Sequence, residues 1–218
     1  MIEMVNTVLI DTHYLPSIEF CCAIFPFDEI VFEGHEHFEK QTYRNRCYVN
    51  TAQGVKMLTV PLRERHGKVL TKDVQIESGD KWRNNHWRTI ESAYRKAPYF
   101  DFYFEGLREI LYRGHELLFD LNRDLMSFCL QSMRAPKKIS ATLTYEDHPE
   151  KNILDVRSTI SPKKAFSERE YYQPQRYYQV FGNEFVPNLS ILDLLFCEGP
   201  RALEIIRSST LLPNKSNK

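Results

Sequence analysis

Two arginines flank an asparagine in the segment Arg44-Asn45-Arg46, and this spacing suits anion binding. Residues two apart share one face of a strand, so we expect Arg44 and Arg46 to lie side by side while Asn45 faces the other way. Paired guanidinium groups donate forked hydrogen bonds that match a carboxylate or a phosphate. The alternative is an edge strand whose arginines pair with acidic residues nearer the N-terminus.

A second group of candidates falls on a predicted helix. Trp82 and His86 share one helical stripe, and Trp87, Glu91 and Tyr94 follow on the neighbouring stripe. Two indole rings beside an imidazole favour stacking on a sugar or a base, with His86 as a general base. The alternative is that these side chains pack in the core.

Other histidines indicate two further kinds of site. His13 lies with Tyr14 in a predicted strand-to-helix loop, where a neutral imidazole can accept a proton; a structural role in the loop is the alternative. His35 and His37 share an extended face with Glu33, as some metal ligands do. Two histidines at this spacing are a weak signal, and we predict no metal and no cofactor.

The charges of the chain are segregated, although 29 basic and 29 acidic residues cancel overall. Residues 1–39 hold eight acidic residues and no lysine or arginine, whereas residues 40–96 hold thirteen basic and five acidic residues. The two segments can neutralise each other by packing side by side. The second interpretation is that the basic segment, which begins at Lys40, lines a site for an anionic ligand.

The scarcity of glycine limits how a phosphate could be held. The chain has 8 glycines and contains neither the dinucleotide-binding nor the P-loop pattern, so side chains must make most phosphate contacts. The zero net charge and the lack of a nucleic-acid-binding motif argue against an RNA or DNA partner. We therefore expect a small-molecule substrate.

The sequence also predicts where the protein works. It contains no run of 18 apolar residues, which argues against a membrane span, and residues 1–10 lack the pattern of a secretory signal. The five cysteines form no C-x-x-C pair, which indicates reduced thiols. We expect a cytoplasmic protein.

The elements at the start of the chain must position His13 and Tyr14. A strand at 8–10, a helix capped by Ser17 and a strand at 30–32 form a βαβ-like unit with parallel pairing. Ligands of such units bind where the carboxyl ends of strands meet helices, so we expect the site beside the first strand.

The rest of the pattern predicts an α/β fold with a small mixed sheet, opened by that unit and flanked by helices from residue 82 onward. The further elements expected are a hairpin over 44–62, a strand at 69–76, helices at 82–96, 100–112 and 115–133, a strand at 139–143, an irregular connection over 147–178, and helices at 190–197 and 201–208. We expect a single domain over residues 1–212 and a flexible tail at 213–218.

A series of short motifs, in order along most of the chain, resembles the WbqC-like family of bacterial proteins. The motifs are Tyr14-Leu15-Pro16, Val31-Phe32 with Phe38 and Lys40, Tyr43-Arg44-Asn45-Arg46, Leu58-Thr59-Val60-Pro61, Asp73-Val74-Gln75-Ile76, Trp82 with His86-Trp87, Tyr94 with Ala97-Pro98-Tyr99-Phe100, and Pro187 to Phe196. The segments 35–37 and 147–175 depart from the family pattern.

The resemblance implies a role in surface-polysaccharide biosynthesis, particularly of O-antigen. Its implied reaction is transfer of an acyl or aminoacyl group, such as glycyl, onto an activated sugar, with His13 or His86 accepting a proton and Asn45 donating to the developing oxyanion. The alternative is a non-catalytic module that binds an anionic glycan precursor or a partner protein.

In that scheme the remaining candidates bind the substrate, which is a sugar phosphate, a nucleotide-sugar or a lipid-linked sugar. Lys40, Arg44 and Arg46 would hold its phosphates, and Trp82 or Trp87 would stack on a sugar ring. Tyr14, Glu91 and Tyr94 complete the expected binding residues.

Overall fold

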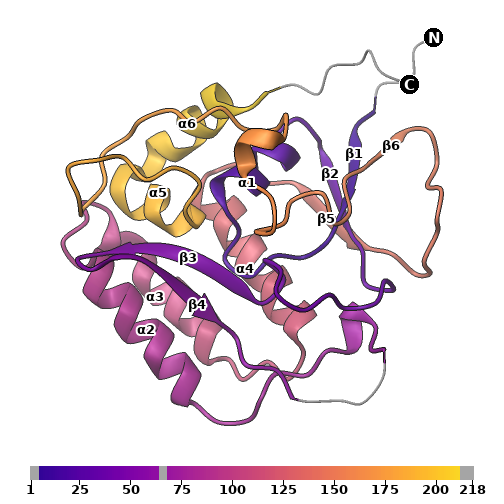
Figure 1. The fold of residues 1–218 in the computed structure, drawn as a ribbon, viewed down its shortest axis with the longest axis horizontal. Helices are drawn as coiled ribbons and strands as arrows, with labels where there is room; N and C mark the ends of the chain where they lie inside the picture. The colour runs from indigo at the N-terminus through magenta and orange to yellow at the C-terminus, as the bar shows by residue number, and fades with distance from the viewer. Residues whose placement is uncertain (1–4, 64–67, 212–218) are drawn as a thin grey trace.

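A four-stranded parallel sheet carries the strand ends at which polar residues gather (Figure 1). The computed structural model describes residues 5–63 and 68–211 of the chain. The strands lie in the order β5-β2-β1-β6 and are β1 (Thr7–Ile10), β2 (Glu29–Phe32), β5 (Lys138–Ala141) and β6 (Ile153–Asp155). Because every pairing is parallel, the four carboxyl ends meet at one edge of the sheet.

The chain begins with the predicted βαβ unit. The side chain of Ser17 accepts a hydrogen bond from the backbone nitrogen of Phe20 at 3.3 Å and so caps α1 (Ile18–Ile24). Every residue of α1 is buried, and the sheet register places Val8 opposite Ile30. The short helix therefore returns the chain so that β2 lies parallel to β1.

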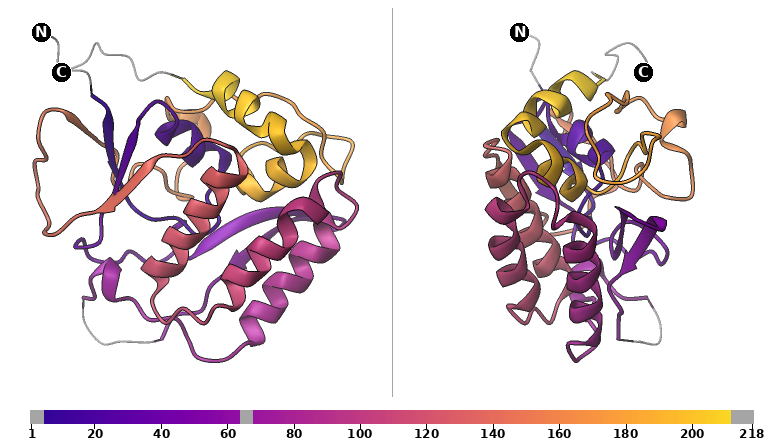
Figure 2. Two further views of the ribbon diagram at one scale, coloured as in Figure 1. Left: turned by 180° about the vertical axis from the view of Figure 1, so that it is seen from behind. Right: turned by 90° about the vertical axis from the view of Figure 1, so that its left-hand side faces the viewer.

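An antiparallel hairpin forms a second sheet. Its strands are β3 (Arg46–Thr51) and β4 (Gly54–Thr59), and Gly54 has a φ of +97°, which favours glycine at this turn. Figure 2 shows the hairpin on one side of the layer of helices α2 to α4. The helices are α2 (Lys81–Tyr94), α3 (Phe100–Tyr112), α4 (Leu118–Ser132), α5 (Ile191–Glu198) and α6 (Ala202–Ser209), and the 3₁₀ turns are η1 (Thr71–Asp73), η2 (Phe166–Glu168) and η3 (Gly199–Arg201).

Two hydrophobic clusters hold these elements together. The first lies between the parallel sheet and α1, α4, α5 and α6, and includes Ile10, Ile30 and Met126. The second lies between the hairpin and α2, α3, α4 and α5, and includes Val49 and Ile90. Because α4 and α5 contribute to both clusters, they join the two sheets.

The structure confirms the α/β class, with parallel and antiparallel pairings in two separate sheets. The strand expected at 69–76 is wrong, because Thr71–Asp73 forms a 3₁₀ turn and the flanking Leu70 and Ile76 make isolated bridges. The connection expected to be irregular over 147–178 contains β6. A strand of three residues is too short to show an alternating pattern, so no local signal marks it.

Three other expectations concern the C-terminal tail, a membrane-spanning helix and the cysteines. The tail predicted at 213–218 lies outside the described residues. Within residues 5–63 and 68–211, no helix has the length and apolar character needed to cross a membrane. The five cysteines are buried and unpaired, and burial raises the pKa of Cys22 to about 12, which argues against a thiolate nucleophile there.

Candidate functional site

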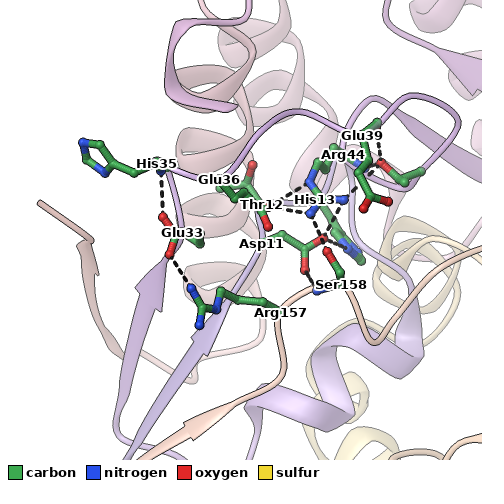
Figure 3. A network of polar contacts seen from close by, with 12 residues as sticks. Asp11, Thr12, His13, Glu33, His35, Glu36, Glu39, Arg44, Arg157 and Ser158 are labelled. Carbon is green, nitrogen blue, oxygen red and sulfur yellow. Dashed lines mark hydrogen bonds and ion pairs between the residues drawn. The ribbon is translucent and has the colours of Figure 1, made fainter. Parts of the chain in front are cut away.

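Polar side chains converge where the four parallel strands end (Figure 3). This edge of a parallel sheet is where α/β proteins bind ligands. The chain brings one or two polar residues to it after each strand, and the loop after β2 adds Glu36 and Arg44. We call this group the strand-end network: Asp11, His13, Glu33, Glu36, Arg44, Thr142, Arg157 and Ser158.

Arg44 lies at the centre of the strand-end network and is only 1% exposed. Its Nη1 is 3.4 Å from Asp11 Oδ2, and its Nε and Nη2 donate to Glu36 Oε1 at 3.1 and 2.5 Å. The same Nη2 donates to the hydroxyl of Ser158 at 2.9 Å. One guanidinium group thus joins residues that follow β1, β2 and β6.

The two carboxyl groups on Arg44 differ in their proton affinity. Burial alone would raise the pKa of Asp11, but the hydrogen bond from His13 and the charge of Arg44 outweigh it and lower the pKa to about 2. Burial raises the pKa of Glu36 to about 7, against the opposing effect of Arg44. A single guanidinium cannot neutralise both carboxylates, so Glu36 can take up a proton near neutral pH.

Glu33 forms a second buried ion pair in the network. It is 0% exposed, and its Oε2 accepts a hydrogen bond from Arg157 Nη1 at 3.0 Å. Its Oε1 accepts from the hydroxyl of Thr142 at 2.8 Å and from the backbone nitrogen of His35 at 2.7 Å. Because each oxygen is satisfied, this pair fixes the ends of β2, β5 and β6 relative to one another.

His13 contacts the Asp11 carboxylate of the strand-end network. Its Nε2 lies 3.1 Å from Asp11 Oδ2, and its ring packs against Phe20 and Tyr43 at centroid distances of 4.4 and 5.3 Å. The residue is 2% exposed. A general base must reach its substrate, so this burial favours the structural alternative for His13, which is to hold the Asp11 carboxylate.

A cavity of about 540 Å³ opens beside the start of the hairpin. Four cationic side chains line it, and among the residues that the structure describes no carboxylate does. We call it the basic cavity. Its lining residues are Lys40, Arg46, Arg63 and Lys68 with His37, Phe38, Gln41, Asn45, Thr59, Val60, Pro61, Leu62, Val69, Val74 and Gln75.

Two buried atoms in the lining of the basic cavity have no hydrogen-bond partner within the described part of the chain. They are Asn45 Oδ1, an acceptor, and Arg46 Nε, a donor. Asn45 is fixed because its Nδ2 donates to the backbone oxygen of Val60 at 3.0 Å. A ligand that supplies a donor to Asn45 and an acceptor to Arg46 removes the cost of both unsatisfied atoms. The free atom of Asn45 is an acceptor, whereas the predicted oxyanion role needs a donor.

Arg44 and Arg46 do not lie side by side as predicted. β3 begins at Arg46, so the alternation of a strand does not extend back to Arg44. Arg44 points into the strand-end network, and Arg46 lines the basic cavity. Arg44 therefore pairs with acidic residues of the N-terminal segment, which was the alternative interpretation. Arg46 is available to bind an anion.

The predicted helix of Trp82 and Trp87 is present, but its indole rings lie in the second hydrophobic cluster. They are 7% and 9% exposed, which leaves little of either ring free for a sugar and favours packing in the core over stacking. Glu91 lies on the helix surface, 3.8 Å from Arg95. The aromatic stripe follows the core alternative.

Tyr14, His86 and Tyr94 form hydrogen bonds inside the same cluster. The hydroxyl of Tyr14 is 2.8 Å from His86 Nδ1, and the hydroxyl of Tyr94 donates to Asp193 Oδ1 at 2.9 Å. Burial lowers the pKa of His86 to about 4, so it is neutral at pH 7. His86 is 5% exposed and borders a separate cavity between β4 and α2. The predicted residues therefore do not all surround one cavity.

Sequence analysis missed Ser158. This exposed residue has a φ of +56°, its backbone nitrogen donates to Asp11 Oδ1 at 2.9 Å, and its hydroxyl accepts from Arg44. It opens on a cavity of about 700 Å³, which we call the serine cavity. That lining comprises Glu39, Ser158, Thr159, Ser161, Lys163, Lys164, Glu168, Arg169, Glu170 and Tyr171. No local sequence pattern marks the residue, since its position depends on backbone geometry and distant partners.

The histidines considered as metal ligands point to different partners. His35 Nδ1 is 3.2 Å from the hydroxyl of Thr142, whereas His37 lines the basic cavity. Over residues 5–63 and 68–211, no group of three or more histidine, cysteine, aspartate or glutamate side chains is arranged to hold a metal ion.

Comparison with known proteins places the chain in a family. An uncharacterized protein of Mycobacterium tuberculosis (strain ATCC 25618 / H37Rv), Rv1507c, is 26% identical over 230 residues, which cover 94% of this chain and 98% of that protein. No solved structure matches the chain. The sequence model of the WbqC-like protein family matches residues 12–176 and 163–205. The chain therefore belongs to the WbqC-like protein family.

Proposed function

We propose that this protein is a cytoplasmic transferase that binds an activated, phosphorylated sugar in the basic cavity and moves an acyl or aminoacyl group onto it. The observation that carries the proposal is the lining of that cavity, which combines four cationic side chains with no carboxylate of the described residues. Such a surface favours an anion at any pH at which the lysines and arginines are charged. The role in surface-polysaccharide biosynthesis is what the resemblance to the WbqC-like family implies, and the family match is consistent with it.

The cationic, polar and apolar residues of the lining contact different parts of the proposed ligand. Lys40 and Arg46 contact the phosphate groups. Arg46 Nε, which has no hydrogen-bond partner among the described residues, supplies a donor that is already buried. Asn45 Oδ1 accepts a hydrogen bond from a sugar hydroxyl or amine. Apolar side chains such as Val60 and Leu62 border the less polar part of the ligand. Sugar phosphates, nucleotide-sugars and lipid-linked sugars share this chemistry.

Calorimetric titration with uridine diphosphate N-acetylglucosamine, and separately with inorganic pyrophosphate, tests the binding. We expect Arg46→Ala to weaken affinity for either probe about tenfold or more, because a hydrogen bond between charged groups contributes about 1.5–3 kcal/mol. Arg95→Ala is the matched control, since it removes an equal charge from an exposed position just after the last residue of α2 and outside the cavity. Equal affinities of Arg46→Ala and the wild type would refute the site.

Mass spectrometry of products tests the reaction. Incubation with glycyl donors and nucleotide-sugars should give a sugar product heavier by one acyl group, and Arg46→Ala should lower its yield. If both probes bind and no such product forms with any donor, the protein is the alternative, a module that binds an anionic glycan precursor.

One observation favours that alternative. His13 and His86, the predicted general bases, are 2% and 5% exposed and do not line the basic cavity. A transferase therefore needs its proton acceptor elsewhere, and His37 is the imidazole that lines the basic cavity. His37→Ala should lower turnover more than pyrophosphate affinity if the protein is an enzyme, and should change neither in a binding module.

A further inference from the structure

We propose that Ser158 is a nucleophile that accepts an acyl group, and that the serine cavity is a second substrate site for an activated acyl ester or thioester. The inference rests on the proposed function, because the acyl group would then pass to the sugar in the basic cavity. It assigns the donor and the acceptor to two different cavities.

The backbone at Ser158 is the first observation. Its φ of +56° is a conformation that glycine adopts at little cost and that other residues seldom adopt. Strained residues of this kind gather at functional sites, where surrounding contacts enforce them. Ser158 lies in the segment just after β6, at the carboxyl edge of the parallel sheet. A side chain at a position better suited to glycine indicates that the hydroxyl is needed.

Two buried residues hold that hydroxyl in place. Asp11 Oδ1 accepts a hydrogen bond from the backbone nitrogen of Ser158 at 2.9 Å, and Arg44 Nη2 donates one to the hydroxyl oxygen of Ser158 at 2.9 Å. Asp11 and Arg44 are each 1% exposed, whereas Ser158 is exposed. Two buried residues therefore hold Ser158 in place while the residue itself lines the serine cavity, and the nearby guanidinium favours the deprotonated hydroxyl oxygen.

Glu36 supplies the proton acceptor. Its Oε1 and the hydroxyl of Ser158 both accept from Arg44 Nη2, at 2.5 and 2.9 Å, so the two side chains meet on one nitrogen atom (Figure 3). A base is most effective when its pKa lies near the working pH, and the Glu36 pKa of about 7 satisfies that condition.

The placement of the two cavities suits a transfer between them. Glu39 lines the serine cavity, whereas its neighbours Lys40 and Gln41 line the basic cavity. The cavities therefore flank one short segment of chain.

The step balances as follows. The oxygen of Ser158 forms a bond to the acyl carbonyl carbon while the bond from that carbon to the leaving oxygen or sulfur breaks. The leaving group departs with the bonding electrons. The seryl proton passes to Glu36 and from there to the leaving group. An oxygen or nitrogen of the bound sugar then forms a bond to the acyl carbon while the bond from that carbon to the Ser158 oxygen breaks. The proton of the attacking hydroxyl or amine passes to Glu36 and from there to the Ser158 oxygen, which restores the free serine.

Labelling with a fluorophosphonate tests the nucleophile in the full-length protein without knowledge of the donor. We expect intact-mass spectrometry to show one adduct, peptide mapping to place it on Ser158, and Ser158→Ala to abolish it. Glu36→Gln should slow labelling about tenfold or more, consistent with the loss of a general base. Ser208→Ala, which removes an exposed serine hydroxyl on α6, is the matched control and should label as the wild type does.

The outcomes separate this inference from the proposed function. Absence of an adduct on Ser158, or equal labelling of Ser158→Ala, would overturn the nucleophile. Pyrophosphate titration of Ser158→Ala should still give the wild-type affinity, which shows that the variant is folded and that the basic cavity is intact. Labelling of Ser158 together with unchanged pyrophosphate affinity in Arg46→Ala would instead remove the proposed function and leave a reactive serine.

Discussion

The hydroxyl oxygen of Tyr14 lies 2.8 Å from Nδ1 of His86, and this buried contact joins the loop after β1 to α2. Loss of such a hydrogen bond leaves a polar nitrogen unsatisfied and costs about 1–3 kcal/mol. We expect Tyr14→Phe to lower the free energy of unfolding in urea by this amount and to leave pyrophosphate affinity unchanged. Tyr145→Phe, at a residue 49% exposed, is the control and should change neither quantity. A Tyr14→Phe variant that loses affinity and keeps its stability would restore the predicted binding role.

The buried His86 makes stability depend on pH. Its pKa is lowered from 6.5 to about 4, so between those values the unfolded chain binds a proton that the folded chain does not. The free energy of unfolding therefore falls as the pH falls through this window. From about pH 7 to about pH 5 we expect the wild type to lose about 2 kcal/mol more than His86→Gln does. Parallel losses in the two proteins would contradict a neutral, buried His86.

Arg44 forms ion pairs with two carboxylates, so removal of its charge should lower the free energy of unfolding. Arg44→Met leaves the buried Asp11 and the partly buried Glu36 without their cation, and we expect a loss of about 3–5 kcal/mol in urea unfolding. Adding Glu36→Gln to that variant removes one of the uncompensated charges and should recover part of the loss. A loss below about 1 kcal/mol in the single variant would show that the ion pairs contribute little.

Substitution of Ser158 separates backbone strain from the role of the hydroxyl. Ser158→Gly and Ser158→Ala both remove the hydroxyl, but only glycine relieves the left-handed backbone. We expect the glycine variant to be more stable than the alanine variant by about 1 kcal/mol in thermal or urea unfolding. Both variants should fail to label with fluorophosphonate. A glycine variant no more stable than the alanine variant would remove the strain argument.

Binding in the basic cavity should depend on salt. Salt screens charges that are exposed to solvent, and the screening length falls from about 10 Å at 0.1 M to about 3 Å at 1 M. We expect pyrophosphate affinity to fall steadily as sodium chloride is raised, with a shallower fall in Arg46→Ala than in Arg95→Ala. Affinity that does not change with salt would exclude the cationic lining as its source.

Local pattern predicted much of the fold. Helical periodicity and Ser17 placed α1, and the same periodicity placed α2 and α3 within a few residues. Those signals are local, because amphipathic spacing and capping act over a few turns. The three-residue β6 had no such signal, since its strand exists through pairing with β1.

The site was predicted less well because its residues come together only in three dimensions. Lys40, Asn45 and Arg46 line one cavity, whereas the spacing of a strand predicts that Asn45 faces away from Arg46. Arg44 could not be distinguished from Arg46, since the difference is the residue at which β3 begins. The position of Ser158 depends on the sign of φ and on partners more than a hundred residues away, which spacing does not report.

The pairing of β1 with β6 also governs when the site can assemble during synthesis. Thr7 pairs with Ile153, and the carboxylate of Asp11 accepts a hydrogen bond from the backbone nitrogen of Ser158. While a nascent chain emerges from the ribosome, β1 keeps one unpaired edge until β6 has been made, and such an edge favours aggregation. A chain released before residue 153 has been made would thus carry β1 and β2 but lack Arg157 and Ser158 at their carboxyl ends.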